Sequence, residues 1–365
     1  MPKGKAAMNN KEYCLLAINV GSTSTKIAFF RETHAVVSET IRYSSEELAR
    51  YAELRDQLSL RTDDLLQFLE KNEINLQEID ILISRGGLGK PGPAGAYKID
   101  APMCEDLLEG KYGKHPSALG PAMVRDIAGK YNKPAIIIDP PSTDEFQPWA
   151  RISGLPELER KSAFHALNQK AAARRVAGEM GKKYEDLNLV VAHLGGGITI
   201  GAHHNGKVVD CTHGLSEGPL TPERAGSLPT QELLDLAFSG KFDKKQLQAR
   251  LVGRGGLVAY LGTTDAQKIE AMIRQGDEKA KLIYQAMAYQ IAKDVGAMSA
   301  VLKGRMDAIV LTGGLACSEM LTGWIKEWVG FLAPVFIYPG EDEMTAMAEG
   351  ALRVLRGEEE LKKYQ

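Results

Sequence analysis

The stretch that decides the fold is residues 15–30, Leu-Leu-Ala-Ile-Asn-Val-Gly-Ser-Thr-Ser-Thr-Lys-Ile-Ala-Phe-Phe. An apolar run, 15–18, leads into Asn19, Gly21 and a series of hydroxyl residues, and a second apolar run, 27–30, leads out. Apolar runs that flank a turn of glycine and small residues predict a β-hairpin. The turn could bind a ligand or simply face solvent, and this stretch alone leaves both interpretations open.

The turn contains the groups that phosphate oxygens require. Gly21 allows a ligand to approach the backbone closely. Ser22 and Ser24 add hydroxyl donors, and Lys26 adds a positive charge. Together with the backbone amides, these groups make the turn a candidate phosphate site.

Length and composition describe a globular protein with two domains. The chain has 365 residues, which is long for a single core, and its 44% hydrophobic and 25% charged residues are ordinary. The net charge of −2 gives no electrostatic signature of nucleic-acid or membrane binding. No apolar run approaches the roughly 20 residues that cross a bilayer. Residues 1–10 lack the apolar core of a signal peptide and are expected to form a frayed tail.

The four cysteines, Cys14, Cys104, Cys211 and Cys317, are widely scattered. No pair has the spacing of a zinc or redox motif. We therefore expect buried free thiols in a reducing compartment.

The opening pattern occurs a second time. Residues 193–201, His-Leu-Gly-Gly-Gly-Ile-Thr-Ile-Gly, again read as a strand, a glycine turn and a strand, and Asn205-Gly206 predicts a tight turn into a third strand. Two hairpins of one design indicate two related half-domains. Such halves would face each other and bring both glycine turns to one nucleotide cleft.

Charged side chains follow two buried strands. Arg85 comes after the apolar run 79–83, and Asp139 comes after 136–138. Ligands collect at the carboxyl ends of strands in open α/β sheets, so Arg85 is a candidate ligand contact and Asp139 a candidate metal ligand. A helix N-cap is the competing interpretation of Asp139. Arg224 lies in a loop that two prolines stiffen.

Helix signals fill the remaining segments. Ser44 and Glu47 form a capping box that predicts a helix reaching Leu58. Gly313-Gly314 follows a buried strand and precedes a helix over 318–328, a weak signal of nucleotide binding.

These motifs occur in the order found in the acetokinase family, which the sequence resembles from about Leu15 to Leu355. Residues 19–26 are similar to the family's first phosphate motif, 193–197 to its second, and 311–314 to its adenosine motif. The resemblance implies an α/β fold of two duplicated ribonuclease-H-like domains with mixed sheets flanked by helices. The implied domains are 1–150 with 345–365, and 151–344.

Within the family, the sequence resembles the butyrate kinase branch. The chain is shorter than acetate kinases, and Gln169 stands where they have a histidine. The Glu-Asn that follows their adenosine motif is also absent. The implied reaction is reversible phosphoryl transfer between ATP and butyrate. An acetate, propionate or branched-chain acid kinase is the alternative within the family, and an ATP-dependent conformational switch is the alternative from another class.

The resemblance also implies roles for individual residues. The two arginines would clamp the carboxylate and the transferred phosphoryl group. Oxygen-bearing side chains would hold Mg²⁺, and Glu341 is an alternative to Glu343 in that role. The implied catalytic residues are Asn19, Arg85, Asp139 and Arg224; the metal-side residues are Asn19, Asp139 and Glu343; the substrate contacts are Arg85, His115 and His165; the nucleotide contacts are Gly21, Ser22, Ser24, Lys26, His193, Gly195, Gly196, Gly197, Asp265, Gly313 and Gly314.

The same resemblance implies the cofactors and the setting. ATP or ADP and Mg²⁺ would bind, and the partner would be a short-chain carboxylate or its acyl phosphate. A homo-oligomer in the cytoplasm is expected. A carboxylate is already ionised at neutral pH, so the reaction needs no general base.

Overall fold

The computed structural model describes residues 11–364, so the predicted tail over residues 1–10 lies outside the described part of the chain. Contacts divide the chain into two compact units. Unit 1 contains the described residues up to Lys90, Gly95–Pro140 and those from Glu343 onward, and unit 2 contains Pro91–Ala94 and Pro141–Asp342. These divisions fall slightly earlier in the chain than the predicted domain boundaries at 150 and 344.

Unit 1 is built on a mixed sheet with the strand order β3-β2-β1-β4-β6-β5. Its strands are β1 (Cys14–Val20), β2 (Ser24–Arg31), β3 (His34–Arg42), β4 (Ile81–Ser84), β5 (Ala96–Lys98) and β6 (Ala135–Ile138). Its helical segments are α1 (Ser45–Leu48), η1 (Leu54–Gln57), α2 (Leu58–Lys71), α3 (Ala101–Glu109), η2 (Pro116–Ala118), α4 (Leu119–Tyr131) and α12 (Glu343–Leu355).

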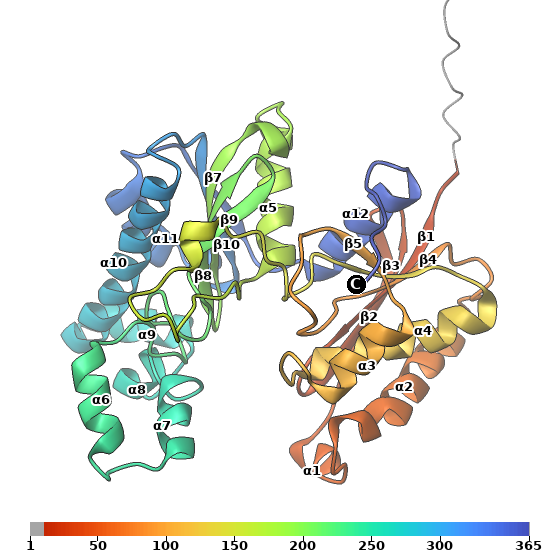
Figure 1. The fold of residues 1–365 in the computed structure, drawn as a ribbon, viewed down its shortest axis with the longest axis horizontal. Helices are drawn as coiled ribbons and strands as arrows, with labels where there is room; N and C mark the ends of the chain where they lie inside the picture. Colours follow the sequence, from red (N-terminus) through yellow and green to blue (C-terminus); the bar gives the residue numbers. More distant parts are fainter. Residues whose placement is uncertain (1–10, 365) are drawn as a thin grey trace, which may run out of the picture. The chain divides into compact units, whose positions relative to one another are not determined.

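Helices cover both faces of this sheet. Successive strand residues point to opposite faces, so Leu16 and Ile18 of β1 pack in one core with residues of α2, α3 and α4. The alternate residues Leu15 and Ala17 are also fully buried, and α12 contacts β1. Figure 1 shows α2, α3 and α4 on one side of the sheet and α12 on the other. This explains why the strands read as continuous apolar runs.

Unit 2 repeats the plan with the strand order β11-β10-β7-β8-β9. Its strands are β7 (Asn188–Leu194), β8 (Ile198–His204), β9 (Lys207–Cys211), β10 (Ala308–Gly313) and β11 (Val335–Pro339). Its helical segments are η3 (Pro148–Arg151), α5 (Ala166–Glu179), η4 (Tyr184–Asp186), α6 (Thr230–Phe238), α7 (Lys244–Leu251), α8 (Leu257–Leu261), α9 (Ala266–Arg274), α10 (Glu278–Val301), η5 (Gly314–Cys317) and α11 (Glu319–Val329).

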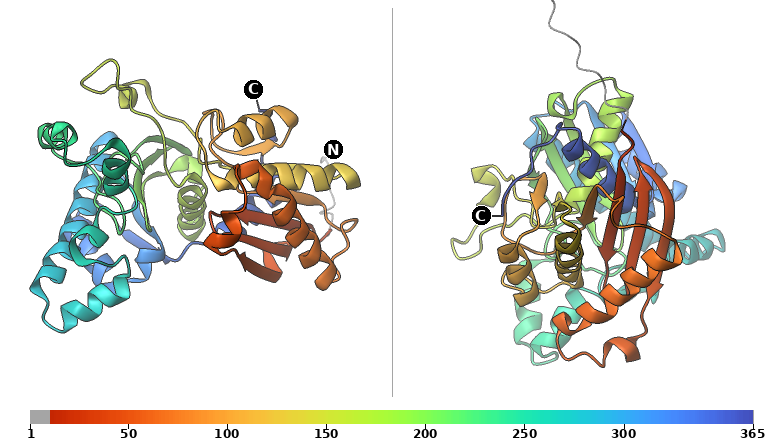
Figure 2. Two further views of the ribbon diagram at one scale, coloured as in Figure 1. Left: turned by 90° about the horizontal axis from the view of Figure 1, so that it is seen from below. Right: turned by 90° about the vertical axis from the view of Figure 1, so that its right-hand side faces the viewer.

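The sheet of unit 2 is also covered on both faces. Val190 and Ala192 of β7 pack with residues of α10 and α11, whereas Leu189 and Val191 pack with residues of α5. Figure 1 shows α5 on one side of the sheet and α10 and α11 on the other, and Figure 2 gives further views of these layers. The methionines of α10, such as Met287, are core residues.

The two sheets share one topology. In unit 1 the antiparallel meander β3-β2-β1 continues into the parallel strands β4 and β6, and in unit 2 the meander β9-β8-β7 continues into β10 and β11. Each glycine turn lies between the first two strands of its unit. Both predicted hairpins are confirmed, as is the tight turn at Asn205-Gly206, where both residues have positive φ.

Two expectations need correction. The predicted helix from Ser44 to Leu58 is broken, because α1 ends at Leu48 and only the short turn η1 precedes α2. Neither α1 nor η1 has a buried residue, so no packed face stabilises a longer helix. All four cysteines are free, but only Cys104 and Cys211 are buried, whereas Cys14 is half-buried and Cys317 is exposed. No helix within residues 11–364 has the length and apolar character of a membrane span.

Candidate functional site

In unit 1, three predicted residues meet at the carboxyl ends of two neighbouring strands. β1 and β4 are parallel, with Ile18 opposite Ser84, so the residues that follow lie close together. The Asn19 Nδ2 donates to Glu343 Oε2 at 2.6 Å, and Arg85 Nη2 lies 3.0 Å from Glu343 Oε1. The structure thus brings Glu343 to Asn19.

His115 joins this cluster as a neutral imidazole. It caps η2, and its Nδ1 accepts a hydrogen bond from the Ser117 backbone amide at 3.2 Å. Burial lowers the pKa of His115, the charge of Arg85 lowers it further, and Glu343 opposes both. An unprotonated Nδ1 leaves the proton on Nε2, so His115 can act as a hydrogen-bond donor beside the arginine.

Asp139 immediately follows β6, the neighbour of β4. It is almost fully buried and has a φ of 40°, an uncommon conformation for a residue other than glycine. Its Oδ1 accepts a hydrogen bond from the Gly95 amide at 2.7 Å. Asp139 is not a helix N-cap, since the next helical segment begins at Pro148.

The first glycine turn is supported by an arginine that the sequence reading missed. Gly21 donates from its amide to the Ser24 carbonyl at 2.8 Å, and the Arg61 guanidinium donates to the carbonyls of Ser22 and Ser24. Arg61 is fully buried. Its position four residues before Leu65 puts it on the apolar face of α2, and this was the signal that could have found it. Ser22 is exposed, and Ser24 and Lys26 are partly exposed.

In unit 2, the second glycine turn carries Arg224. A Cβ at Gly197 would overlap the Arg224 guanidinium, so this close approach requires glycine. The Arg224 Nη1 donates to the Gly214 carbonyl at 2.5 Å. The structure therefore places Arg224 against the turn Gly195–Gly197.

Thr221 connects the loop of Arg224 to the same turn. Its hydroxyl donates to the Gly196 carbonyl at 2.6 Å and accepts a hydrogen bond from the Arg224 amide at 3.0 Å. The sequence reading missed Thr221, although it precedes the proline that was expected to stiffen this loop. Thr221 holds the backbone of Arg224 in place.

The guanidinium of Arg224 is partly buried and is not paired with a carboxylate among the described residues. Burial lowers the pKa of Arg224, and the nearby Glu223 opposes this effect. Among the described residues, no carboxylate forms an ion pair with Arg224, and its buried Nε has no hydrogen-bond partner. A partly desolvated guanidinium beside a glycine turn is suited to bind an anion with two parallel hydrogen bonds.

Two predicted histidines stack on each other beside this turn. The rings of His165 and His193 are parallel, with centroids 3.7 Å apart. His193 lies between Asn168 Oδ1, at 2.7 Å from its Nδ1, and Glu341 Oε1, at 3.1 Å from its Nε2. Glu341 thus belongs to the histidine pair of unit 2.

A pocket of about 510 Å³ lies beside Gly314. Its walls include Glu270, whose Oε1 accepts a hydrogen bond of 2.5 Å from the Ser318 hydroxyl. A Cβ at Gly313 would overlap the backbone of Leu194, so this glycine allows close packing of strand ends. Asp265, a predicted nucleotide contact, uses its carboxylate to cap α9.

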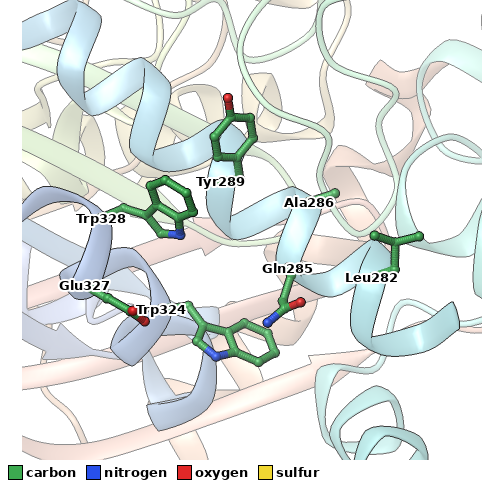
Figure 3. Close-up of a pocket in the computed structure, with 7 residues that line it drawn as sticks. All are labelled: Leu282, Gln285, Ala286, Tyr289, Trp324, Glu327 and Trp328. Atoms are coloured by element: carbon green, nitrogen blue, oxygen red, sulfur yellow. The ribbon is translucent and has the colours of Figure 1, made fainter. Parts of the chain in front are cut away.

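A second cavity, of about 450 Å³, lies between α10 and α11. Figure 3 shows its aromatic lining, in which Tyr289 and Trp328 make an edge-to-face contact with centroids 5.2 Å apart. None of the predicted site residues lines this cavity. It offers little for phosphoryl transfer, since Glu327 is its one charged wall residue.

His203 gives unit 2 a testable pH dependence. Its complete burial, followed by the charges of Lys170 and Arg174, holds the pKa of His203 well below its ordinary value. The unfolded chain therefore binds a proton below about pH 6.5 that the folded protein does not bind. Stability is highest above that pH and falls as the pH decreases, by up to about 1.4 kcal/mol per pH unit.

The measurement is urea unfolding of the wild type and of His203→Gln at several pH values. All three tryptophans, at 149, 324 and 328, lie in unit 2, so tryptophan fluorescence reports this unit. Burial raises the pKa of Asp294 to about 6, which stabilises the folded protein as the pH falls. Because the wild type and the variant both contain Asp294, this effect cancels when their stabilities are subtracted. We expect the variant to lose less stability on acidification, and identical pH slopes would contradict the assignment.

Comparisons with known proteins agree with this architecture. Residues 156–321 match the model of the acetokinase family. Acetate kinase from Porphyromonas gingivalis is similar at 18% identity with a TM-score of 0.78, over 94% of this chain and 100% of that one. Propionate kinase from Francisella tularensis is 17% identical with a TM-score of 0.73, over 93% and 98% of the two chains. Acetate kinase from Entamoeba histolytica is 18% identical with a TM-score of 0.73, over 93% and 99%.

The predicted class, an α/β fold with two mixed sheets flanked by helices, is thereby confirmed. The chain has the two-domain fold of acetate and propionate kinases, and its residues 156–321 match the acetokinase family.

Proposed function

We propose that this protein is an ATP-dependent kinase of short-chain carboxylates, with butyrate as the preferred acceptor. The observation that carries the proposal is Arg224, a half-buried cation that rests on a glycine turn and forms no ion pair within residues 11–364. Arg85 is a second arginine, and it already holds a carboxylate, that of Glu343. The family match of residues 156–321 supports the same reaction class.

The proposed reaction is direct attack of a carboxylate oxygen on the γ-phosphorus of ATP. A bond forms between that oxygen and phosphorus as the bond from phosphorus to the ADP oxygen breaks. The acceptor is already an anion, so catalysis depends on alignment and on stabilising the charge of the transferred group. Arg85 and Arg224 are assigned to these tasks, His115 and His165 to hydrogen bonds with substrate oxygens, and the two glycine turns to the nucleotide phosphates.

Magnesium fits the oxygen-bearing residues of unit 1. Glu343 and Asp139 supply carboxylate oxygens, and Asn19 already contacts Glu343. Among residues 11–364, no group of three or more histidine, cysteine, aspartate or glutamate side chains forms a metal cage. Mg²⁺ commonly binds through one or two carboxylates, waters and substrate phosphates, which suits this donor set. When bound, the ion would neutralise phosphate charge.

Replacing Glu343 by glutamine is expected to weaken divalent-ion binding about 10–100-fold, the usual loss when a supporting group of a metal site is removed. Binding of Mn²⁺ in the presence of ADP, followed by electron paramagnetic resonance, measures this directly. Glu359→Gln is the matched control, because Glu359 pairs with Arg353 as Glu343 pairs with Arg85, and the two glutamates are similarly exposed. Equal Mn²⁺ affinity of the wild type and Glu343→Gln would contradict the assignment.

The acceptor is tested by trapping acyl phosphate with hydroxylamine in the presence of ATP and Mg²⁺. We expect kcat/KM to rise from acetate to propionate to butyrate, with each methylene contributing about 1–3 kcal/mol. Acetate or propionate as the best substrate would favour the alternative within the family, to which the similar structures belong by name. ADP formation that does not depend on a carboxylate would favour a conformational ATPase switch.

A further inference from the structure

A chain of hydrogen bonds inside unit 2 ends at His165. It connects Tyr184, His203, Gln169, Thr199 and His165, and the first four of these are buried. Gln169 and Thr199 have no accessible surface. A buried amide without water nearby must satisfy its hydrogen bonds in the protein, so its partners fix its orientation.

The carbonyl of Thr199 sets the direction of the whole chain. The Gln169 Nε2 lies 3.0 Å from this carbonyl, which can only accept, so the amide nitrogen must face Thr199. Its second hydrogen points to Thr199 Oγ1 at 2.9 Å. The Gln169 Oε1 therefore faces His203 Nε2, at 3.1 Å, and must accept from it. His203 is neutral, and its Nδ1 accepts from the Tyr184 hydroxyl at 2.8 Å.

The same reasoning shows to which atom the Thr199 hydroxyl donates its hydrogen. Its Oγ1 accepts from Gln169 and, at 3.4 Å, from the His165 backbone amide, which occupies both lone pairs. The Thr199 hydroxyl hydrogen is left to be donated, and His165 Nδ1 lies 2.8 Å from Thr199 Oγ1. Thr199 must donate to that nitrogen, so in neutral His165 the proton is on Nε2.

The fold makes room for Gln169 in this position. A Cβ at Gly201 would overlap the Gln169 Oε1, so a glycine in the middle of β8 admits the amide. The imidazole of His165, whose tautomer this arrangement sets, is stacked on His193 beside the second glycine turn. A Cβ built at Gly214 would lie 3.1 Å from Thr199 Cγ2 and 3.5 Å from Arg224 Nη1, so Thr199 lies near Arg224.

We propose that Gln169 is a positioning residue which, through Thr199, holds His165 in its Nε2–H tautomer, so that His165 presents its Nε2–H as a hydrogen-bond donor to the anionic oxygens of the substrate. This proposal rests on the proposed function for its substrate, whereas the tautomer is a property of the ligand-free protein. The two can therefore fail separately.

Gln169→Met is the decisive variant because it has nearly the length of glutamine and no hydrogen-bond donor. Without the Gln169 donor, Thr199 Oγ1 has a free lone pair and can accept from His165 Nδ1 as well as donate to it. We expect the single tautomer of His165 to become a mixture of the Nδ1–H and Nε2–H forms. Tyr184→Phe is the matched control, since it removes a hydroxyl of the same chain and leaves the Thr199 carbonyl to orient Gln169.

The readout is ¹⁵N NMR of histidine-labelled, ligand-free protein above pH 7, with His165 assigned by its substitution. We expect a protonated Nε2 in the wild type and in Tyr184→Phe, and a mixture with protonated Nδ1 in Gln169→Met. The kcat for acyl phosphate should fall several-fold in Gln169→Met, with a smaller change in the carboxylate KM. A protonated Nδ1 in the wild type, an unchanged single tautomer in Gln169→Met, or a mixture without loss of kcat would each overturn the proposal. Correct tautomers in a protein that forms no acyl phosphate would instead refute the proposed function.

Discussion

Arg224→Ala is expected to lower kcat about 10²–10³-fold, a loss of about 2.7–4 kcal/mol of transition-state stabilisation, which is the usual cost of removing one preorganised charge donor. The reason is local. Thr221 and the Gly214 carbonyl hold Arg224 against Gly197, and its guanidinium has no ion pair among the described residues. Its charge is therefore available to a substrate anion. Steady-state hydroxamate assays with saturating ATP measure the effect.

The same variant should leave the free energy of unfolding nearly unchanged. Removing a half-buried cation that has no ion pair in the described part of the chain relieves a desolvation cost, which offsets the lost hydrogen bond to Gly214. Arg160→Ala is the matched control, because Arg160 pairs with Asp210 and Glu217. That control should lose stability and keep the kcat of its folded fraction. Near-normal turnover of Arg224→Ala would show that the anion site is misassigned.

Arg85→Ala has the second large expected effect, a fall of about 10²–10³-fold in kcat/KM for the carboxylate. Arg85 contacts Glu343 at 3.0 Å, which demonstrates that a carboxylate fits its guanidinium. Arg85→Lys should recover only part of the loss, because an ammonium group cannot bind a carboxylate with two parallel N–H groups. Initial rates at varied carboxylate concentration separate the change in KM from that in kcat.

Arg353→Ala provides the control for Arg85 within unit 1. Arg353 pairs with Glu359 at 2.8 Å, and both side chains are about as exposed as those of Arg85 and Glu343. This substitution removes a comparable ion pair and should leave kcat/KM of the folded protein unchanged. A similar loss of activity in both variants would mean that Arg85 acts through stability alone.

Local sequence signals were sufficient for the framework of both units. The runs that flank Gly21 and Gly196 alternate between two buried faces, and small residues in each turn allow the strands to reverse. The positions of Arg85 and Asp139 after buried strands were also readable, because each follows a short apolar run. The shared topology of the two sheets follows from the repeated hairpin.

Contacts between distant residues could not be read in the same way. Glu341 and Glu343 differ by two positions, yet the first contacts His193 and the second contacts Asn19 and Arg85. Only the backbone path into α12 decides this. In the sequence Arg61 looks like a surface charge, whereas in the structure it binds the first glycine turn. The helix expected to reach Leu58 stops at Leu48 because no core packs against it.

The central claim is that a carboxylate oxygen attacks the γ-phosphorus of ATP. Transfer of ¹⁸O from the carboxylate to phosphate tests this claim most directly. The protein is incubated with ATP, Mg²⁺ and butyrate labelled with ¹⁸O in both carboxylate oxygens, and hydroxylamine then cleaves the acyl phosphate at its carbonyl carbon. Direct attack predicts that the released phosphate contains one ¹⁸O atom. Phosphate without ¹⁸O, or phosphate formed equally well in the absence of a carboxylate, would contradict it.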